Sequence, residues 1–317
     1  MAIPANIIQE YNKVLQPLIA QQIVAGSTSG WMEGNASQVQ FTGGKGIKVP
    51  VLETNGLGDY ARNAGAYDNT VDLSYITREM TMDRGTNFNL DEQDIEETNF
   101  ALQVNNVITT FNKTHVIPEI DCYRYSKLFT DIAKAKGRES EADNFKQDAL
   151  TKDNILETIL TDIDKVKEET GNSIPLVCII SKPEMLKLRV KHKTELDKVQ
   201  FVNGVIDTEV TGIDDVPFLE VPSKRMKTSY QFYNGTSDGQ TAGGCVPGST
   251  SKDINYMIVP ACAPIGITKV NKLGLIMPDS NMDMFAYRVK YRLYHDLWTL
   301  PCYADISVAS VKKVAGE

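Results

Sequence analysis

Residues 99–137 read NFALQVNNVITTFNKTHVIPEIDCYRYSKLFTDIAKAKG, and two apolar stripes at helical spacing run through them. The first stripe consists of Phe100, Val104, Val107 and Phe111. In the second segment Ile120, Arg124, Leu128 and Ile132 continue one face of the helix, which is apolar apart from Arg124. Pro118 lies between the stripes and is expected to kink or split the helix. If the two pieces are roughly collinear they span about 60 Å, which is very long for a compact domain and predicts a spine.

The acidic segment before this helix provides a predicted start. Asn89 and Glu92 have the spacing of a capping box, in which two side chains bond to free backbone N–H groups of the first turn. Asp91 and Asp94 suit the positive end of the helix dipole. We therefore expect the helix to begin close to residue 89.

Two segments before the helix contain too few large apolar residues to form a core of their own. Residues 1–30 combine a short amphipathic segment, which includes Tyr11, with a Gly/Ser/Thr linker at 26–30. Residues 36–86 carry charges of both signs and contain three predicted strands, at 39–42, 47–52 and 71–83. We expect another subunit to cover these segments.

The remainder of the chain reads as an α/β region followed by β structure. Thr151 is expected to cap a helix that ends at Gly171, a buried strand follows at 176–180, and Ser181 caps the next helix. Further strands are expected at 205–208 and 218–221, a turn at 214–217, and a long loop at 235–251. Residues 285–294 alternate between apolar and basic or polar side chains, which predicts a long strand with two different faces.

Composition narrows the functional classes. The chain has 317 residues, of which 42% are hydrophobic, and a net charge of −8. That charge argues against a nucleic-acid reader, which needs a basic face, but is compatible with enclosing nucleic acid without gripping it. The sequence contains no apolar run long enough to cross a membrane, and the segment at residues 1–4 does not resemble a secretory signal.

The sequence contains no convergent set of catalytic residues. The five cysteines (Cys122, Cys178, Cys245, Cys262 and Cys302) form no Cys-x-x-Cys pair, so we interpret them as isolated reduced thiols. His115, His192 and His295 lie in different elements without metal-ligand spacing, and we expect surface or partly buried structural roles. The segment GGKG at 43–46 lacks the spacing of a phosphate-binding loop. We therefore expect no catalytic residues, no cofactor and no metal.

The order of these elements resembles that of the major capsid proteins of tailed bacteriophages, which have the Hong Kong 97 type fold. Local sequences are similar too: GLGDYAR at 56–62, EMTMDRG at 79–85, VIPEID at 116–121, VPSKRM at 221–226 and NYMIV at 255–259. The resemblance covers nearly the whole chain, and its specificity lies in the order of the motifs.

The resemblance implies an α+β protein with an N-arm, an E-loop hairpin, a long spine helix in a P domain and an α/β A domain. The expected boundaries are 1–35 for the N-terminal arm, 36–86 for the E-loop, 87–140 for the P-domain spine helix, 141–263 for the A domain, 264–300 for the P-domain strands and 301–317 for a C-terminal strand.

The resemblance further implies a non-enzymatic protein that self-assembles as hexamers and pentamers into an icosahedral phage head. The head encloses double-stranded DNA without sequence-specific contact. The expected partners are other copies of the chain, a separate scaffolding protein and a portal, with no membrane. The expected location is the virion, and the bacterial host cytoplasm during assembly. The E-loop and N-arm are expected to make the inter-subunit contacts, through Lys45, Lys48, Asp59, Tyr60, Arg62, Arg78, Glu79, Asp83, Arg84 and Tyr11. Some members of the family crosslink an E-loop lysine, and Lys45 lies where such a lysine would lie.

Two alternatives stay open at this point. An encapsulin-type nanocompartment shell shares the fold and encloses cargo enzymes instead of DNA. An α/β enzyme with its site in residues 141–263 belongs to another class, and it requires a pocket with clustered carboxylates or histidine.

Overall fold

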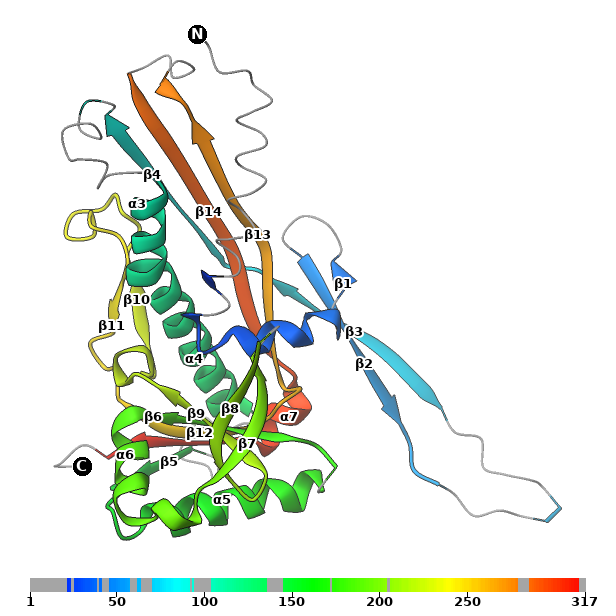
Figure 1. Ribbon diagram of the computed structural model, residues 1–317. Coiled ribbons are helices and arrows are strands. Elements are labelled where there is room, and N and C mark those ends of the chain that lie inside the picture. Colours follow the sequence, from blue (N-terminus) through cyan, green and yellow to red (C-terminus); the bar gives the residue numbers. More distant parts are fainter. Residues whose placement is uncertain are drawn as a thin grey trace.

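A computed structural model shows two sheet-and-helix layers at either end of one long helical element, with a β-hairpin projecting from the side (Figure 1). The structure describes residues 22–23, 26–38, 40–41, 46–57, 62–63, 70–91, 93, 104–135, 145–171, 173–203, 206–278 and 285–313. None of the helices in this described part is long and apolar enough to span a membrane.

The predicted spine consists of α3 (Val104–Phe111), a π-helical segment (Asn112–Val116) and α4 (Ile117–Lys134). Pro118 lies in the first turn of α4, where its missing N–H is best tolerated. The break predicted at Pro118 is therefore a change of helix type and not a split. The predicted start at Asn89 is wrong, because residue 89 lies in a strand and pairs with Arg288.

A three-stranded antiparallel sheet covers the α3 end of the spine. Its order is β13 (Pro264–Ile276), β14 (Ala286–Thr299) and β4 (Met82–Asp91). The alternation predicted at 285–294 is confirmed in its middle, where Val289, Tyr291 and Leu293 join a core with the spine while Lys290 and Arg292 are exposed. It is wrong at its ends, because Phe285 is exposed and Ala286 and Tyr294 are buried. The strand predicted at 71–83 instead breaks at residues 80–81 into β3 (Val71–Glu79) and β4, so its second part belongs to this sheet.

A seven-stranded mixed sheet lies at the other end of the spine. Its order is β5 (Phe145–Asp148), β15 (Val308–Lys312), β12 (Ile254–Pro260), β6 (Leu176–Ser181), β9 (Val216–Val221), β8 (Ile206–Ile213) and β7 (Asp197–Asn203). Every residue of β6 is buried, because helices cover both faces of the sheet. One face packs against α4, and the other packs against α5 (Ile155–Thr170) and α6 (Lys182–Lys191).

Several local predictions in this region are confirmed. The strand at 176–180 lies in β6, α6 begins directly after Ser181, and Gly171 ends α5 with a φ of 66°. The predicted cap Thr151 is wrong, because Asn154 is the residue that precedes α5. The turn after β8 uses Asp214 and Asp215, which both have positive φ. The loop predicted at 235–251 is partly wrong, because β11 (Cys245–Pro247) lies in it and pairs with β10 (Tyr230–Phe232). The predicted C-terminal strand is β15, which follows α7 (Pro301–Ile306) and returns to the seven-stranded sheet.

The projecting element is an antiparallel hairpin of β2 (Gly46–Thr54) and β3, extended at its base by β1 (Gln40–Phe41). It points away from both sheets (Figure 1). A 3-10 helix, η1 (Gly30–Gln38), precedes it and crosses β13. Gly266 of β13 makes this crossing close, since a Cβ atom there would lie 3.2 Å from the Cβ of Met32.

Candidate assembly surfaces and their anchors

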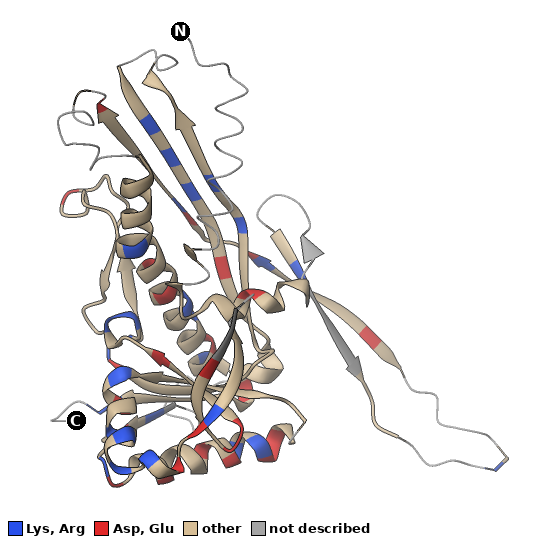
Figure 2. Cartoon of the chain, in the orientation of Figure 1, with Lys and Arg blue, Asp and Glu red and all other residues tan. Residues whose placement is uncertain are grey.

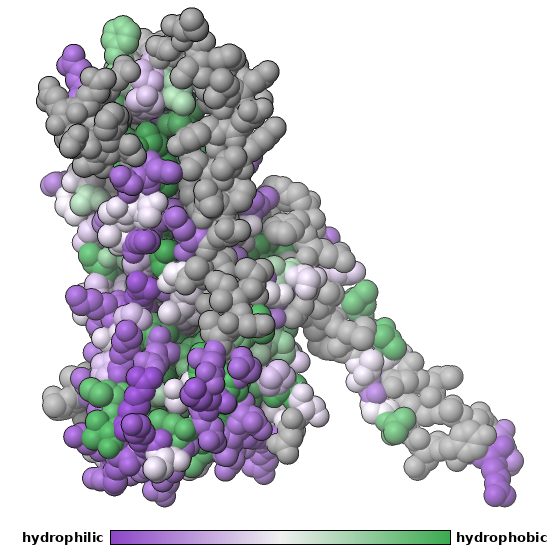
Figure 3. Space-filling view, in the orientation of Figure 1, coloured by the Kyte–Doolittle hydropathy of each residue, from purple (hydrophilic) through white to green (hydrophobic). Residues whose placement is uncertain are grey.

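The shaft of the β2–β3 hairpin exposes apolar side chains to solvent. Val71, Leu73 and Tyr75 alternate along one face of β3, with 63%, 56% and 49% of their surfaces exposed. Leu57, just past the end of β2, is fully exposed. Figure 3 shows hydrophobic residues in green on the surface of the described part of the projecting hairpin. A two-stranded hairpin is marginally stable in water by itself, so this shaft has the properties of a surface that another molecule covers.

The base of the same hairpin is fixed in a small core. Ile47 is completely buried, in a cluster completed by Met80, Ile265, Ile267, Tyr294 and Trp298. The Tyr294 hydroxyl donates to the Met80 carbonyl at 3.0 Å. The hairpin is therefore held at one end by packing, whereas Val71, Leu73 and Tyr75 of its shaft are exposed.

The chain immediately after the hairpin is tied down by a buried carboxylate. Asp296 accepts hydrogen bonds from the Tyr123 hydroxyl at 2.6 Å and from the Thr81 backbone N–H at 2.8 Å. Burial and the Asp296 charge both raise the pKa of Tyr123, so the phenol stays protonated and keeps donating. This network joins the hairpin exit, the spine and β14.

The contact residues predicted for the E-loop and N-arm fall into three groups. Lys48, Arg62, Arg78 and Glu79 are exposed, and the Lys48 ammonium lies 5.9 Å from the centroid of the Tyr75 ring. Tyr11, Lys45, Asp59 and Tyr60 lie outside the described residues. Asp83 and Arg84 belong to β4 and make ion pairs within the subunit, with Arg292 and Glu119 respectively. For these two the predicted assignment to the E-loop is wrong, because β4 pairs with β14 instead of continuing the hairpin.

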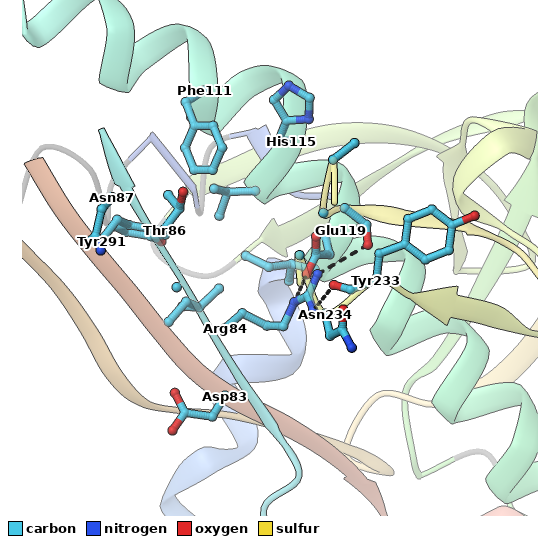
Figure 4. Close-up of a pocket in the computed structure, with 18 of the residues that line it drawn as sticks. Asp83, Arg84, Thr86, Asn87, Phe111, His115, Glu119, Tyr233, Asn234 and Tyr291 are labelled. Atoms are coloured by element: carbon cyan, nitrogen blue, oxygen red, sulfur yellow. Dashed lines mark hydrogen bonds and ion pairs between the residues drawn. The ribbon is translucent and has the colours of Figure 1, made fainter. Parts of the chain in front are cut away.

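Arg84 lines a cavity of about 810 Å³ between β4, the spine, β14 and the loop that joins β10 to β11. Its guanidinium donates to Glu119 at 2.7 Å and to the carbonyls of Tyr233 at 2.6 Å and Gly244 at 3.2 Å (Figure 4). Three acceptors thus fix the arginine, which holds the β10–β11 loop against the spine. Tyr291 also lines the cavity, and its buried hydroxyl has no hydrogen-bond partner among the described residues.

The segment predicted as a Gly/Ser/Thr linker is an anchor. The Asp121 carboxylate on α4 is fully buried and accepts from the hydroxyls of Ser27 (2.9 Å), Thr28 (3.0 Å) and Ser29 (2.7 Å). The backbone N–H groups of Thr28 and Ser29 also donate to it, at 3.2 and 3.1 Å. Arg225 supplies the compensating charge at 3.0 Å. The linker prediction is wrong because small polar residues fit around a buried anion as readily as they form a flexible connection.

The chain that follows this anchor stays attached to the body. Glu33 accepts from Arg124 at 2.5 Å and from the Thr268 hydroxyl at 3.0 Å. The Asn35 amide donates to the carbonyls of Ala261 and Pro264, both at 2.8 Å. Trp31 and Met32 are buried in the core between α4 and the seven-stranded sheet. Residues 26–38 therefore share the core of their own subunit, although residues 1–30 were expected to need a neighbour.

Charge is distributed unevenly over this acidic chain. Rows of basic residues follow β13 and β14 (Figure 2). Lys272 lies directly across from Arg292 in the register, and Lys290 lies on the same face two residues before Arg292. Although the net charge of the chain is −8, the sheet face that points away from the spine is basic.

The sequence predicts surface or partly buried histidines and isolated cysteine thiols, and the structure differs from this prediction at two places. His295 is fully buried, and its Nδ1 atom has no hydrogen-bond partner in the part of the chain that the structure describes. Cys245 is a neighbour of Cys122 and raises the pKa of the Cys122 thiol, so these two cysteines are not isolated. Within the described residues, no group of three or more His, Cys, Asp or Glu side chains could hold a metal ion.

The residues that hold these surfaces in place were not found by sequence reasoning. The bonds of Asp121 with Ser29, of Asp296 with Thr81 and of Tyr123 with Asp296 each join residues that are 92 or more positions apart in the sequence. A lone aspartate inside an apolar helix face is the one available signal, because such a residue must be satisfied when it is buried.

Comparison with known proteins identifies the fold. No protein-family model matches the chain, and no curated protein matches its sequence. Solved phage structures do match. The capsid of cyanophage P-SCSP1u has a TM-score of 0.56 and 8% identity, over 87% of this chain and 86% of that chain. The mature capsid of bacteriophage PhiM1 has a TM-score of 0.54 and 11% identity, over 86% and 83%. The capsid of Staphylococcus phage Andhra has a TM-score of 0.51 and 10% identity, over 87% and 82%. The expected α+β architecture of the Hong Kong 97 type is confirmed.

Replacing Asp121 with alanine is expected to destabilise the subunit by about 3 kcal/mol, because it leaves Arg225 and the buried donors of residues 27–29 without their acceptor. Urea unfolding of the unassembled chain measures this loss. Asp153, which forms an exposed ion pair with Lys191, supplies the control, and Asp153→Ala should leave the midpoint unchanged. Equal stability of the Asp121→Ala variant and the wild type would contradict the anchor.

A second prediction concerns His295. Burial, with smaller effects from Arg124 and Arg84, lowers the pKa of His295 to about 3, against 6.5 for the free side chain. Below pH 6.5 the unfolded chain binds a proton that the folded chain does not, so stability falls as the pH drops from 6.5 towards 3. At pH 5 this one group should cost about 2 kcal/mol relative to pH 7.

The variant His295→Phe keeps an aromatic ring beside Tyr123 but cannot be protonated. Its loss of stability between pH 7 and pH 5 should be smaller than that of the wild type by about 2 kcal/mol, as measured by urea unfolding at both values. The same loss in both proteins would show that His295 is protonated in the folded state.

Proposed function

From the Hong Kong 97 type fold of phage capsid proteins, we propose that this chain is the major capsid protein of a tailed bacteriophage. It self-assembles as hexamers and pentamers into an icosahedral head that encloses double-stranded DNA. The fold is shared with the phage capsid structures over more than four fifths of the chain. At identities of 12% or less these structures share the fold of this chain, and the geometry of the subunit supports the function.

The projecting hairpin is the observation that carries the proposal. Its base is rigidly packed, yet its shaft exposes three large apolar side chains in a row. Burying one such side chain contributes roughly 1.5–3 kcal/mol. A surface of this kind is costly in a monomer and is stabilised when a neighbouring copy covers it. Repeated around a ring, individually modest contacts of this type produce a cooperative closed shell.

The two anchors explain how the hairpin keeps a fixed orientation relative to the rest of its subunit. The Asp121 and Asp296 carboxylates fix the chain on both sides of the hairpin to the same helix, α4. A hairpin held in this way keeps a defined direction relative to the spine. The exposed charges of Lys48, Arg78 and Glu79 set register and partner choice more than affinity.

The proposed partners follow from this role. Other copies of the chain cover the hairpin, and a separate scaffolding protein and a portal complete the head. Packaged DNA touches the shell without sequence-specific contact. The protein acts in the virion, is present in the host cytoplasm during assembly, and has no enzymatic activity of its own. The domain boundaries expected from the sequence are kept, except that residues 82–91 belong to the P-domain sheet.

Assembly tests the proposal through the shaft. The triple variant Val71→Thr, Leu73→Thr and Tyr75→Thr keeps residues that favour strands but removes the apolar face. The concentration needed for particle formation should rise at least about tenfold, since each 1.4 kcal/mol lost is a factor of ten. Negative-stain microscopy and sedimentation of a concentration series measure this change, and circular dichroism checks that the subunit stays folded.

The triple variant Glu157→Gln, Thr161→Ser and Glu168→Gln on the exposed face of α5 is the matched control and should assemble as the wild type does.

Deletion of residues 43–66 should leave a soluble folded monomer that forms no shells. Normal particles from either hairpin variant would contradict the proposal. The content of wild-type particles formed in infected cells separates a DNA-filled head from an enzyme-filled compartment.

A further inference from the structure

The β10–β11 ribbon lies on the spine with one of its faces towards α4. Phe232 of β10 contacts Tyr123 of α4, with ring centroids 5.7 Å apart. Cys245 of β11 is the direct cross-strand partner of Phe232. Directly opposed residues in an antiparallel pair project on the same face, so the Cys245 side chain also points towards α4.

Cys122 precedes Tyr123 on α4 and is buried beneath this ribbon. Its sulfur lies 3.9 Å from the Lys224 carbonyl oxygen, which also accepts from the Tyr230 hydroxyl at 2.8 Å. Tyr230 is the first residue of β10. The Cys122 thiol and the Cys245 thiol therefore both lie between the helix and the ribbon.

We propose that Cys122 and Cys245 form a reversible disulfide that fastens the β10–β11 ribbon to the spine helix. The pairing depends on contacts within this subunit alone, so it does not rest on the proposed capsid function. None of the other cysteines takes part: Cys178 is buried in β6, on the face of the seven-stranded sheet that α5 and α6 cover, and Cys262 and Cys302 lie near α7.

The two thiols have different roles in the exchange with a small disulfide such as oxidised glutathione. Cys245 is half-buried and Cys122 is buried. The neighbouring Cys122 thiol lowers the pKa of Cys245, whereas the neighbouring Cys245 thiol and burial raise the pKa of Cys122. Cys245 is therefore the thiol that ionises first and attacks.

The exchange proceeds in two steps that balance. The Cys245 thiolate attacks one sulfur of oxidised glutathione, forming a mixed disulfide and releasing one glutathione thiolate, which takes up the proton lost by Cys245. Cys122 then gives up its proton and attacks the Cys245 sulfur, and the second glutathione leaves as a thiol. Overall, two protein thiols are oxidised and one molecule of oxidised glutathione is reduced to two of glutathione.

The bond would reinforce a contact that already exists. Arg84 holds the Gly244 carbonyl next to Cys245, so the ribbon is positioned before any oxidation takes place. Closing the chain between residues 122 and 245 constrains the unfolded state across α5, α6 and most of the seven-stranded sheet. A reducing cytosol keeps the pair open, and release into an oxidising medium allows it to close.

Peptide mapping tests the proposal directly, because trypsin places each cysteine in its own peptide. Cys122 lies in residues 114–124 and Cys245 in residues 228–252, and neither peptide contains a second cysteine. The full chain is reduced, exposed to excess oxidised glutathione, blocked with iodoacetamide and digested. We expect mass spectrometry to find these two peptides joined in most molecules, and separated again after treatment with dithiothreitol.

Stability provides an independent measurement. Oxidation should raise the Tm of the wild type by roughly 5 °C, and the variants Cys245→Ser and Cys122→Ala should both lose this increase. The variant Cys302→Ser removes an exposed thiol and is the matched control, so it should keep both the joined peptides and the increase. Recovery of Cys122 and Cys245 as alkylated or glutathione-bound peptides after oxidation of the folded wild type would overturn the proposal.

Discussion

Burial of the Asp121 carboxylate is favourable only if its oxygens accept enough hydrogen bonds, and several distant segments of the subunit supply the donors. Three consecutive residues, Ser27 to Ser29, wrap the carboxylate with hydroxyl and backbone donors, and Arg225 neutralises its charge. These donors come from the segment before the hairpin and from the turn after β9. The Asp121 side chain thereby joins residues 27–29, the spine helix α4 and the segment that follows β9 of the seven-stranded sheet.

The same helix holds the chain on the other side of the hairpin. Tyr123 lies two residues after Asp121 and donates to Asp296, which in turn fixes Thr81. The described chain both enters and leaves the hairpin beside α4, and Ile47 fills a core at its base. Rigidity at the base and apolar exposure along the shaft are complementary properties, because a projecting element can direct assembly only if its own direction is fixed.

Sequence reasoning succeeded where the signal was local and periodic. The second spine face, the middle of the β14 alternation and the glycine that ends α5 all reflect the nearest neighbours of each residue. In the first spine stripe, Val104 and Phe111 do pack in the core, but Phe100 lies outside the described residues and Ile108 takes the place expected of Val107. It failed at Asn89, where a valid capping pattern was overridden by pairing of β4 with a strand about 200 residues away. Ser27 to Ser29 and the pair Cys122 and Cys245 were missed for the same reason. Their partners are distant in sequence, and nothing in the local pattern names them.

Hydrogen–deuterium exchange of the two hairpin strands, compared between unassembled subunits and purified particles, tests the central claim most directly. A shaft that a neighbouring copy covers should exchange rapidly in the subunit and at least about tenfold more slowly in the particle at residues 46–54 and 71–79. The buried strand at 176–181, which is protected within each subunit, should change little. Equally rapid exchange of the hairpin in both states would mean that the shaft stays uncovered and that the shell is built from other surfaces.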